Sequence, residues 1–236
     1  MHIGSRLETI GRLVPQGAVV ADVGTDHAYL PVWLIEQGRI ERAIAGDIAA
    51  GPCQAARSTV AQHGLQNSVE VRQGSGLSVL KPGEASCITI AGMGASTMIA
   101  ILEADMEVAQ AAELLLLQPM AGAASLRAWL CEHGWELADE ELVDDAPHFY
   151  EIISARRGVS RAYSAAEYAV GPVLWAKQHP LVGRPLERQL VTTQQLLENM
   201  GRSERARISS RYQELQQLQA ALEVLEDEYC DHRCAG

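Results

Sequence analysis

The pattern that most constrains the fold is an alternation of short, continuous apolar runs with longer amphipathic stretches. The apolar runs predict strands at residues 18–24, 42–47, 68–74, 86–92 and 113–119. Helices are predicted between most of them, at 28–37, 51–63, 95–110 and 122–134. Strands that are apolar throughout are buried on both faces, and intervening helices join parallel neighbours. The sequence therefore predicts an α/β fold built on a parallel sheet.

The two ends of this repeat have their own character. The chain opens with an amphipathic helix, in which Ile3, Leu7 and Ile10 share one stripe. The segments 135–145 and 148–157 follow each other without a helix, which predicts a terminal antiparallel hairpin. This is the layout of a class I methyltransferase sheet, a Rossmann-like fold, and we assign residues 1–157 to it.

From residue 158 onward the composition changes to long stretches rich in Gln, Leu, Glu and Arg. Leucines at helical spacing over 215–225 predict a helical hairpin or a short antiparallel coiled coil within a second domain, 158–236. Gly201 and Ser203 mark the expected reversal, with Ser203 placed to cap the last helix.

Charge and cysteine usage limit the partners. The formal net charge is −11, yet residues 161–211 carry eight basic and four acidic side chains, so a local patch could meet phosphates or form a solvated face of mixed charge. No apolar run reaches the roughly 20 residues that a bilayer needs, and we expect a cytoplasmic protein without a membrane partner. Five cysteines without a CxxC pair indicate neither a disulfide framework nor a zinc ribbon. The CDHRC tail at 230–234 could hold a metal, but a frayed C-terminus is favoured and we expect no metal site. The oligomeric state stays open.

The stretch VVADVGTDHAYLP, residues 19–31, carries the first candidate site. In a parallel sheet of this kind, ligands bind beyond the carboxyl ends of the strands. Gly24 would let a ligand approach the backbone, and Asp22 and Asp26 can accept hydrogen bonds from an ammonium group or hydroxyls. The dinucleotide pattern GxGxxG is absent, and a loop carboxylate would repel a pyrophosphate. A cationic ligand such as S-adenosylmethionine is favoured, and a turn ordered by its own Asp hydrogen bonds is the alternative.

Three further strand ends extend this candidate site. The second predicted strand ends at Asp47, and an acid there can bind both hydroxyls of a ribose. The third ends in QGSGL, 73–77, where glycines allow close approach of an adenine ring. The fourth ends in ITIAGMGAS, with Gly92 and Gly94 where a transferred methyl group would meet its acceptor. Together these strand ends predict a nucleoside-containing cofactor.

Seven stretches occur in the order of a known family: ADVGTDHAYLP, AIAGDIAAGP, VRQGSGL, ITIAGMGA, LLLLQPM, FYEII and VGPVL. In this combination the chain resembles the bacterial tRNA (adenine-N1) methyltransferases that act on adenine 22, the TrmK family. The resemblance implies S-adenosylmethionine-dependent methylation of tRNA by a Rossmann-like domain, with a coiled-coil domain that helps to hold the RNA. The family usually reads QGDGL, AGMGG and often QPN where this chain has Ser75, Ala95 and Met120.

The resemblance also implies which residues hold the cofactor. The loop after the first strand and the acid after the second would bind its methionine and ribose parts. The third strand end would lie by its adenine and the fourth beside the reacting methyl group. The predicted cofactor-binding residues are Asp22, Gly24, Asp26, His27, Asp47, Ile48, Gly74, Ser75, Gly76, Leu77, Ala91 and Gly92.

The predicted catalytic residues are Asp26, His27, Tyr29 and Met93. Methyl transfer from a sulfonium is an in-line displacement that mainly requires acceptor and donor to be held about 3 Å apart. N1 methylation yields a cation, so a carboxylate would stabilise the developing charge, with Asp26 the first candidate and His27 the second. Either residue could instead bind only cofactor or order the turn. Tyr29 is a candidate for stacking on the target base, as is Tyr150, for which core packing is the alternative.

Arginines are the expected contacts to tRNA, because guanidinium groups suit phosphates and carry most of the positive charge of this chain. The predicted RNA-binding residues are Arg6, Arg12, Arg184, Arg188, Arg202, Arg205, Arg207 and Arg211. A helix-surface pair with Glu198 is an alternative for Arg205, and dimerisation is an alternative for the tail.

Two other functions remain compatible with the sequence. A methyltransferase acting on a small molecule or a protein suits the acidic net charge, and transfer of a methyl group to tRNA would discriminate it. A non-catalytic binding module of the same fold is compatible with Ser75, Ala95 and Met120, and cofactor binding without turnover would reveal it.

Overall fold

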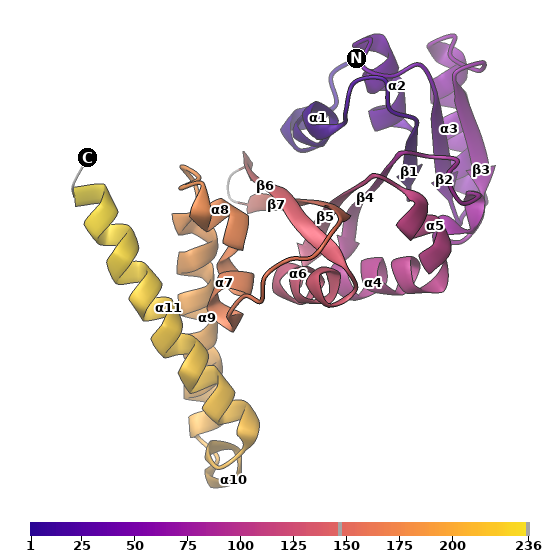
Figure 1. Cartoon of the computed structure of the whole chain (residues 1–236). Helices are drawn as coiled ribbons and strands as arrows, with labels where there is room; N and C mark the ends of the chain where they lie inside the picture. Colours follow the sequence, from indigo (N-terminus) through magenta and orange to yellow (C-terminus); the bar gives the residue numbers. More distant parts are fainter. Residues whose placement is uncertain (146–147, 235–236) are drawn as a thin grey trace. The chain divides into compact units, whose positions relative to one another are not determined.

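A seven-stranded mixed sheet organises the first part of the chain, in the order β3-β2-β1-β4-β5-β7-β6 (Figure 1). The computed structural model describes residues 1–145 and 148–234, with only the main chain at 232–234. The parallel strands are β1 (Val20–Val23), β2 (Ala43–Asp47), β3 (Val69–Gln73), β4 (Cys87–Gly94) and β5 (Leu114–Ala121). The antiparallel strands β6 (Trp135–Asp145) and β7 (His148–Arg157) follow, with β7 next to β5. The predicted Rossmann-like α/β fold with its terminal hairpin is confirmed.

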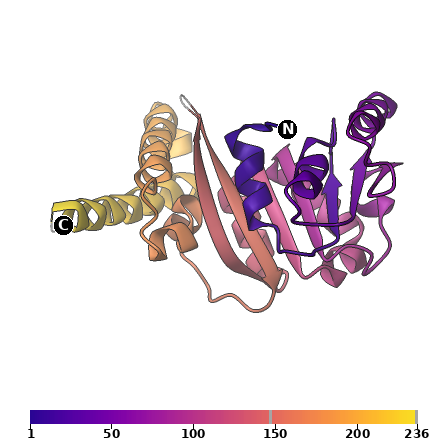
Figure 2. The same cartoon turned by 90° about the horizontal axis from the view of Figure 1, so that it is seen from above.

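Helices cover both faces of the sheet, as continuous apolar strands require (Figures 1 and 2). One face carries α1 (Gly4–Leu13), α2 (Tyr29–Glu36) and α3 (Ala50–Gln62). The other carries α4 (Ala95–Ala104), α5 (Met106–Ala111) and α6 (Ala123–Glu132), and the 3-10 helix η1 (Gly76–Val79) contacts α4. The prediction of one helix over 95–110 is wrong, because the backbone of Asp105, at φ −136° and ψ 56°, separates α4 from α5.

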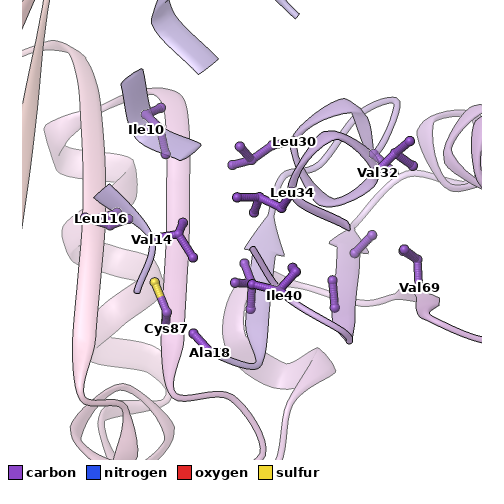
Figure 3. Close-up of a cluster of buried hydrophobic side chains, with 14 of the residues drawn as sticks. Ile10, Val14, Ala18, Leu30, Val32, Leu34, Ile40, Val69, Cys87 and Leu116 are labelled. Carbon is purple, nitrogen blue, oxygen red and sulfur yellow. The ribbon is translucent and has the colours of Figure 1, made fainter. Parts of the chain in front are cut away.

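A buried cluster fixes α1 and α2 to the sheet (Figure 3). Ile10 on α1, Val14 directly after it, and Leu30 and Leu34 on α2 are each at most 2% exposed. Burial of a side chain of this size contributes roughly 1.5–3 kcal/mol relative to exposure. The chain then passes from Val14 to the start of β1, so α1 begins near the opposite, carboxyl end of the strands.

The strand order places β1 between β2 and β4. The chain proceeds outward from β1 to β2 and β3, then crosses back to β4 on the other side of β1. Both flanking pairs are parallel, so the ends of β1, β2 and β4 lie at the same edge of the sheet. A sheet of this type has its crevice at such a reversal of strand order.

A buried ion cluster joins α6 to the terminal hairpin. The Arg127 guanidinium donates to the carboxylates of Glu140 on β6 and Glu151 on β7. Arg127 and Glu140 are fully buried and Glu151 is 4% exposed. Charges removed from water in this way are stable only while each keeps its partner.

Residues 162–236 form a separate compact unit of helices. Its helices are α7 (Ala165–Val170), α8 (Pro172–Ala176), α9 (Gly183–Gly201), α10 (Glu204–Arg207) and α11 (Ser210–Cys234). The long helices α9 and α11 contact each other, and they bury Leu186, Leu215 and Leu222. This agrees with a helical hairpin, whereas coiled-coil packing stays a prediction. In the described residues, no helix is both long and apolar enough to cross a membrane.

The reversal between α9 and α11 differs from the expectation. The Ser203 hydroxyl accepts a hydrogen bond from the Ala206 amide and therefore caps the short helix α10. The Ser209 hydroxyl accepts from the Tyr212 amide at the start of α11. The prediction that Ser203 caps the last helix is wrong because an additional helical turn intervenes.

Loss of Arg127 should destabilise the first unit strongly. We expect Arg127→Met to lower the free energy of unfolding by about 3–5 kcal/mol, because two buried carboxylates lose their counter-ion. Arg156→Met is the matched control, since Arg156 is exposed and pairs with Glu136 at 3.1 Å; its expected cost is below about 1 kcal/mol. Urea titration measures the free energy of unfolding of both variants. Equal losses in the two would contradict the prediction that the buried ion cluster contributes more to stability than the exposed pair.

Candidate cofactor and acceptor site

The Asp22 carboxylate ties the end of β1 to β4. One oxygen accepts a hydrogen bond from the Thr25 hydroxyl at 2.6 Å and the other from the Thr89 hydroxyl at 2.7 Å. Burial raises the pKa of Asp22, against the opposing effects of these hydrogen bonds and of the Arg6 charge. Asp22 is 7% exposed, so this predicted cofactor ligand faces the interior and orders the loop that follows it.

The loop after β1 has an unusual backbone. The amides of Gly24 and Thr25 both donate to the Gly46 carbonyl on β2, at 2.8 and 3.0 Å. Asp26 and Ala28 have φ of 53° and 56°, in the left-handed region that costs a side-chain-bearing residue about 1–2 kcal/mol. Strain of this kind collects at functional sites, where surrounding contacts maintain it.

Three predicted catalytic residues lie together here, Asp26 and His27 on this strained loop and Tyr29 at the start of α2. The His27 ring stacks on the Tyr29 ring, with centroids 5.0 Å apart and an interplanar angle of 8°. The His27 Nε2 atom lies 3.6 Å from a carboxylate oxygen of Asp26. Asp26 and Tyr29 are exposed, so the loop presents an acid, an imidazole and an aromatic ring to solvent.

Met93, the fourth predicted catalytic residue, lies over the same loop. A Cβ atom added at Gly24 would come within 2.2 Å of the Met93 methyl carbon. The absence of a side chain at Gly24 therefore leaves room for the end of the Met93 side chain over the loop. Gly92, whose φ is +79°, and Ala91 complete the predicted residues at this strand end.

The ends of β2 and β3 form the second part of the site. One oxygen of Asp47 accepts a hydrogen bond from the Ala49 amide at 2.9 Å, and its other oxygen has no donor among the described residues. The apolar side chain of Ile48 is 68% exposed beside it. The Gly74 amide donates to the Asp47 carbonyl at 2.9 Å. The site thus combines an available carboxylate with an exposed apolar surface.

The segment after β3 carries the remaining predicted cofactor residues. Gly74, Ser75 and Gly76 form the turn into η1, and Leu77 is fully buried under it. A Cβ atom at Gly74 would lie 2.7 Å from a Val79 methyl group, so the chain passes closely over itself here. The predicted residues of β3 therefore adjoin Asp47, as the strand order requires.

An arginine fixes the end of this segment to β3. Arg72 donates to both carboxylate oxygens of Glu84, at 2.8 and 2.6 Å, and to the Val79 carbonyl at 2.7 Å. It also binds Glu70 on the same strand. The hydrogen bonds from Arg72 lower the pKa of Glu84 to about 2. This cluster holds η1 against the sheet beside the site.

Gln118 is a functional candidate that sequence reasoning missed. It is fully buried on β5, and its side-chain oxygen accepts hydrogen bonds from Arg6 at 2.6 Å and from the Gly92 amide at 3.1 Å. The Arg6 guanidinium lies over the Tyr150 ring, 5.5 Å from its centroid. The sequence feature that could have indicated Gln118 is its position as a single polar residue after four consecutive leucines in ELLLLQP, 113–119.

Arg6 and Arg12 belong to the first unit, and the other predicted RNA contacts belong to the second. Arg12 is exposed on α1 and lies 3.7 Å from Glu8. Arg184 and Arg188 lie in the first part of α9. The remaining four gather near the reversal between α9 and α11, where all are exposed: Arg202, Arg205, Arg207 and Arg211. In the described part of the chain, no group of three or more His, Cys, Asp or Glu side chains is arranged to hold a metal ion.

Comparison with known proteins identifies the family. Residues 3–153 match the family described as "Methyltransferase domain". The tRNA (adenine(22)-N(1))-methyltransferase of Bacillus subtilis (strain 168) is 36% identical over 237 residues, which cover 98% of each chain. This chain belongs to the tRNA (adenine(22)-N(1))-methyltransferase family. The resemblance predicted from the strand-end motifs is confirmed.

Solved structures of this family share the fold over nearly the whole chain. The B. subtilis m1A22 tRNA methyltransferase TrmK superposes with a TM-score of 0.84 at 33% identity, covering 97% of this chain and 99% of that one. Streptococcus pneumoniae Sp1610, solved in complex with S-adenosyl-L-methionine, gives a TM-score of 0.80 at 35% identity. The match covers 92% of this chain and 100% of Sp1610.

The Arg72–Glu84 pair should make stability depend on pH. Glu84 has a lowered pKa in the folded state, so its stabilising contribution is complete above the unfolded value of about 4.5 and is lost as the pH falls toward 2. We expect Glu84→Gln to cost roughly 1 kcal/mol at pH 7, a small effect because water screens the pair, and progressively less below pH 4.5. Urea titrations from pH 7 to 3.5 measure the difference, with exposed Glu41→Gln as control. A difference that grows on acidification would contradict this assignment.

Proposed function

We propose that this chain transfers the methyl group of S-adenosylmethionine to N1 of adenine 22 in tRNA. The chain belongs to this family, and the observation that carries the proposal is that the ends of its strands lie together. The Met93 side chain lies over the Gly24 loop, and Asp47 at the end of the neighbouring strand β2 has an available carboxylate oxygen. The 36% identity to the B. subtilis enzyme over 98% of the chain supports the same reaction.

The residues present fit the cofactor chemically. Asp47 offers an oxygen without a protein donor, which suits a ribose hydroxyl, and exposed Ile48 next to it suits the face of an adenine. Gly74, Ser75 and Gly76 would border that adenine. At the other strand ends, Gly24 and Asp26 would hold the methionine part, with Asp22 ordering their loop through its two threonine hydrogen bonds.

The cofactor supplies a methyl group already activated by its sulfonium, so the chain mainly has to position the acceptor. The end of β4, from Ala91 to Met93, would border the reacting atoms. Adenine N1 carries a lone pair, and its methylation creates a cation. The exposed Asp26 carboxylate would stabilise that charge, and the stacked His27 and Tyr29 rings offer a flat surface to the base.

Recognition of tRNA requires contacts beyond the reacting base. N1 lies on the Watson–Crick edge, so the adenine must be unpaired when it is methylated. The exposed arginines at the reversal between α9 and α11 are proposed to bind the RNA backbone. This role would explain a local basic surface in a chain with a net charge of −11.

Methyl transfer to defined tRNA tests the proposed reaction. We expect the purified protein to convert adenine 22 of an unmodified bacterial tRNA transcript to N1-methyladenosine, seen as a reverse-transcription stop, and to leave a guanine-22 transcript unmodified. Asp26→Ala should reduce the rate at least about 100-fold, the usual scale for loss of electrostatic stabilisation in a transition state. Exposed Asp227→Ala on α11 is the control for loss of one carboxylate. Transfer to another position or to protein would contradict the substrate assignment.

Gly24→Ala should weaken cofactor binding. A methyl group there would displace Met93, and φ of +77° strains any side-chain-bearing residue. We expect at least a tenfold increase, about 1.4 kcal/mol, in the dissociation constant of S-adenosylhomocysteine by titration calorimetry. Gly17→Ala is matched, with the same φ but open space around the new Cβ atom, and should leave binding unchanged. Equal affinities for the two variants would argue against cofactor binding at this loop.

A further inference from the structure

Arg6 occupies a defined position at the ends of β4 and β5. One of its terminal nitrogens donates to Gln118 at 2.6 Å, and its guanidinium lies over the Tyr150 ring. A Cβ atom added at Gly92 would be 3.6 Å from that same nitrogen, so the guanidinium lies beside the strand end that would border the reacting methyl group. Arg6 therefore differs from the exposed arginines of the second unit.

The Arg6 charge opposes the raised pKa of the buried Asp22 carboxylate but makes no ion pair with it. Within the described residues Arg6 forms no ion pair, and its hydrogen bond to Gln118 is the one it makes. Its remaining N–H groups are therefore available to a ligand that accepts hydrogen bonds. An arginine with a fixed side chain and free donors is suited to bidentate binding of an anion.

The reaction itself indicates which anion. N1 methylation makes the adenine cationic, so a guanidinium facing that ring would oppose product formation. Each nucleotide also brings a phosphate on either side of its sugar, and a phosphate bound to Arg6 would neutralise its charge. Resting on the proposed function, we infer that Arg6 binds a phosphate flanking the target adenosine and that Gln118 positions Arg6 for this contact.

The surroundings of Gln118 fix which way its amide points. Its oxygen accepts from two N–H donors, Arg6 and Gly92, while its nitrogen donates to the Pro119 carbonyl at 3.1 Å and lies 3.7 Å from the Met120 sulfur. Reversal of the amide would set N–H groups against N–H groups. Gln118, which is fully buried, thus couples the guanidinium to the backbone of β4.

Kinetics of four variants test the inference. Arg6→Ala should lower kcat/KM for tRNA roughly 10- to 100-fold, the range for loss of a charge-assisted hydrogen bond, with affinity for S-adenosylhomocysteine unchanged. Arg57→Ala is the control and should stay within about twofold, because Arg57 is an exposed arginine on α3 whose guanidinium donates to the Val71 carbonyl at 3.3 Å and has no proposed part in the site. Gln118→Met should lower kcat/KM in the wild-type background but not in the Arg6→Ala background, because it acts through Arg6. Thermal unfolding checks that each variant is folded.

A neutral linkage identifies the ligand of Arg6. Two tRNAs carry a 2′-deoxy methylphosphonate on the 5′ or the 3′ side of adenosine 22, each compared with the 2′-deoxy phosphodiester. One of them should slow the wild-type protein to the rate of Arg6→Ala and leave that variant unaffected. Three results would each overturn the inference alone. The first is equal slowing of the wild-type protein and Arg6→Ala by the methylphosphonates, and the second is additive effects of Arg6→Ala and Gln118→Met on kcat/KM. The third is a loss of cofactor affinity in Arg6→Ala as large as its loss of kcat/KM. Failure of the wild-type protein to methylate adenine 22 would overturn it together with the proposed function.

Discussion

The two hydrogen bonds of the Asp22 carboxylate hold together the strand ends on which the candidate site depends. Thr25 belongs to the loop after β1 and Thr89 to β4, so a single buried side chain connects the loop to the neighbouring strand. The Gly24 and Thr25 amides connect the same loop to β2. The left-handed backbone at Asp26 and Ala28 is maintained by this double attachment.

The site is organised by charge as well as by shape. Carboxylates lie after β1 and β2, where a cationic methionine moiety and ribose hydroxyls would bind, and Arg6 lies by β4 and β5, where the nucleic acid would enter. In the proposed reaction, this separation would place negative groups near the developing positive charge and a positive group near a phosphate. It would also explain why a net charge of −11 is compatible with tRNA as substrate.

The part of the site that could be predicted from the sequence consists of residues at or directly after the ends of predicted strands. Asp22, Gly24 and Asp47 follow apolar runs directly, and parallel topology brings such positions to one edge. Gln118 and Arg6 lie 112 residues apart in sequence, and no local pattern indicates that they meet. Their contact depends on α1 packing against the sheet through Ile10, which is a property of the tertiary structure.

Helix boundaries and buried charges were the harder part to predict. Asp105 interrupts a helical pattern without Gly or Pro, so periodicity alone gave one helix where there are two. Ser203 and Ser209 could each cap a helix. Because the short helix α10 lies between them, Ser209 and not Ser203 is at the start of α11. In the sequence, Arg127 has the position of an exposed residue on the polar face of an amphipathic helix. In the structure it is buried and binds the carboxylates of Glu140 on β6 and Glu151 on β7.

A crystal structure of this protein with S-adenosylhomocysteine tests the central claim most directly. We expect the ribose hydroxyls to bind the Asp47 carboxylate, the adenine to lie against Ile48, and the sulfur to lie beside the end of β4 near Met93. A ligand bound elsewhere, or one whose ribose makes no contact with Asp47, would contradict the assignment of this sheet edge as the methyl-transfer site.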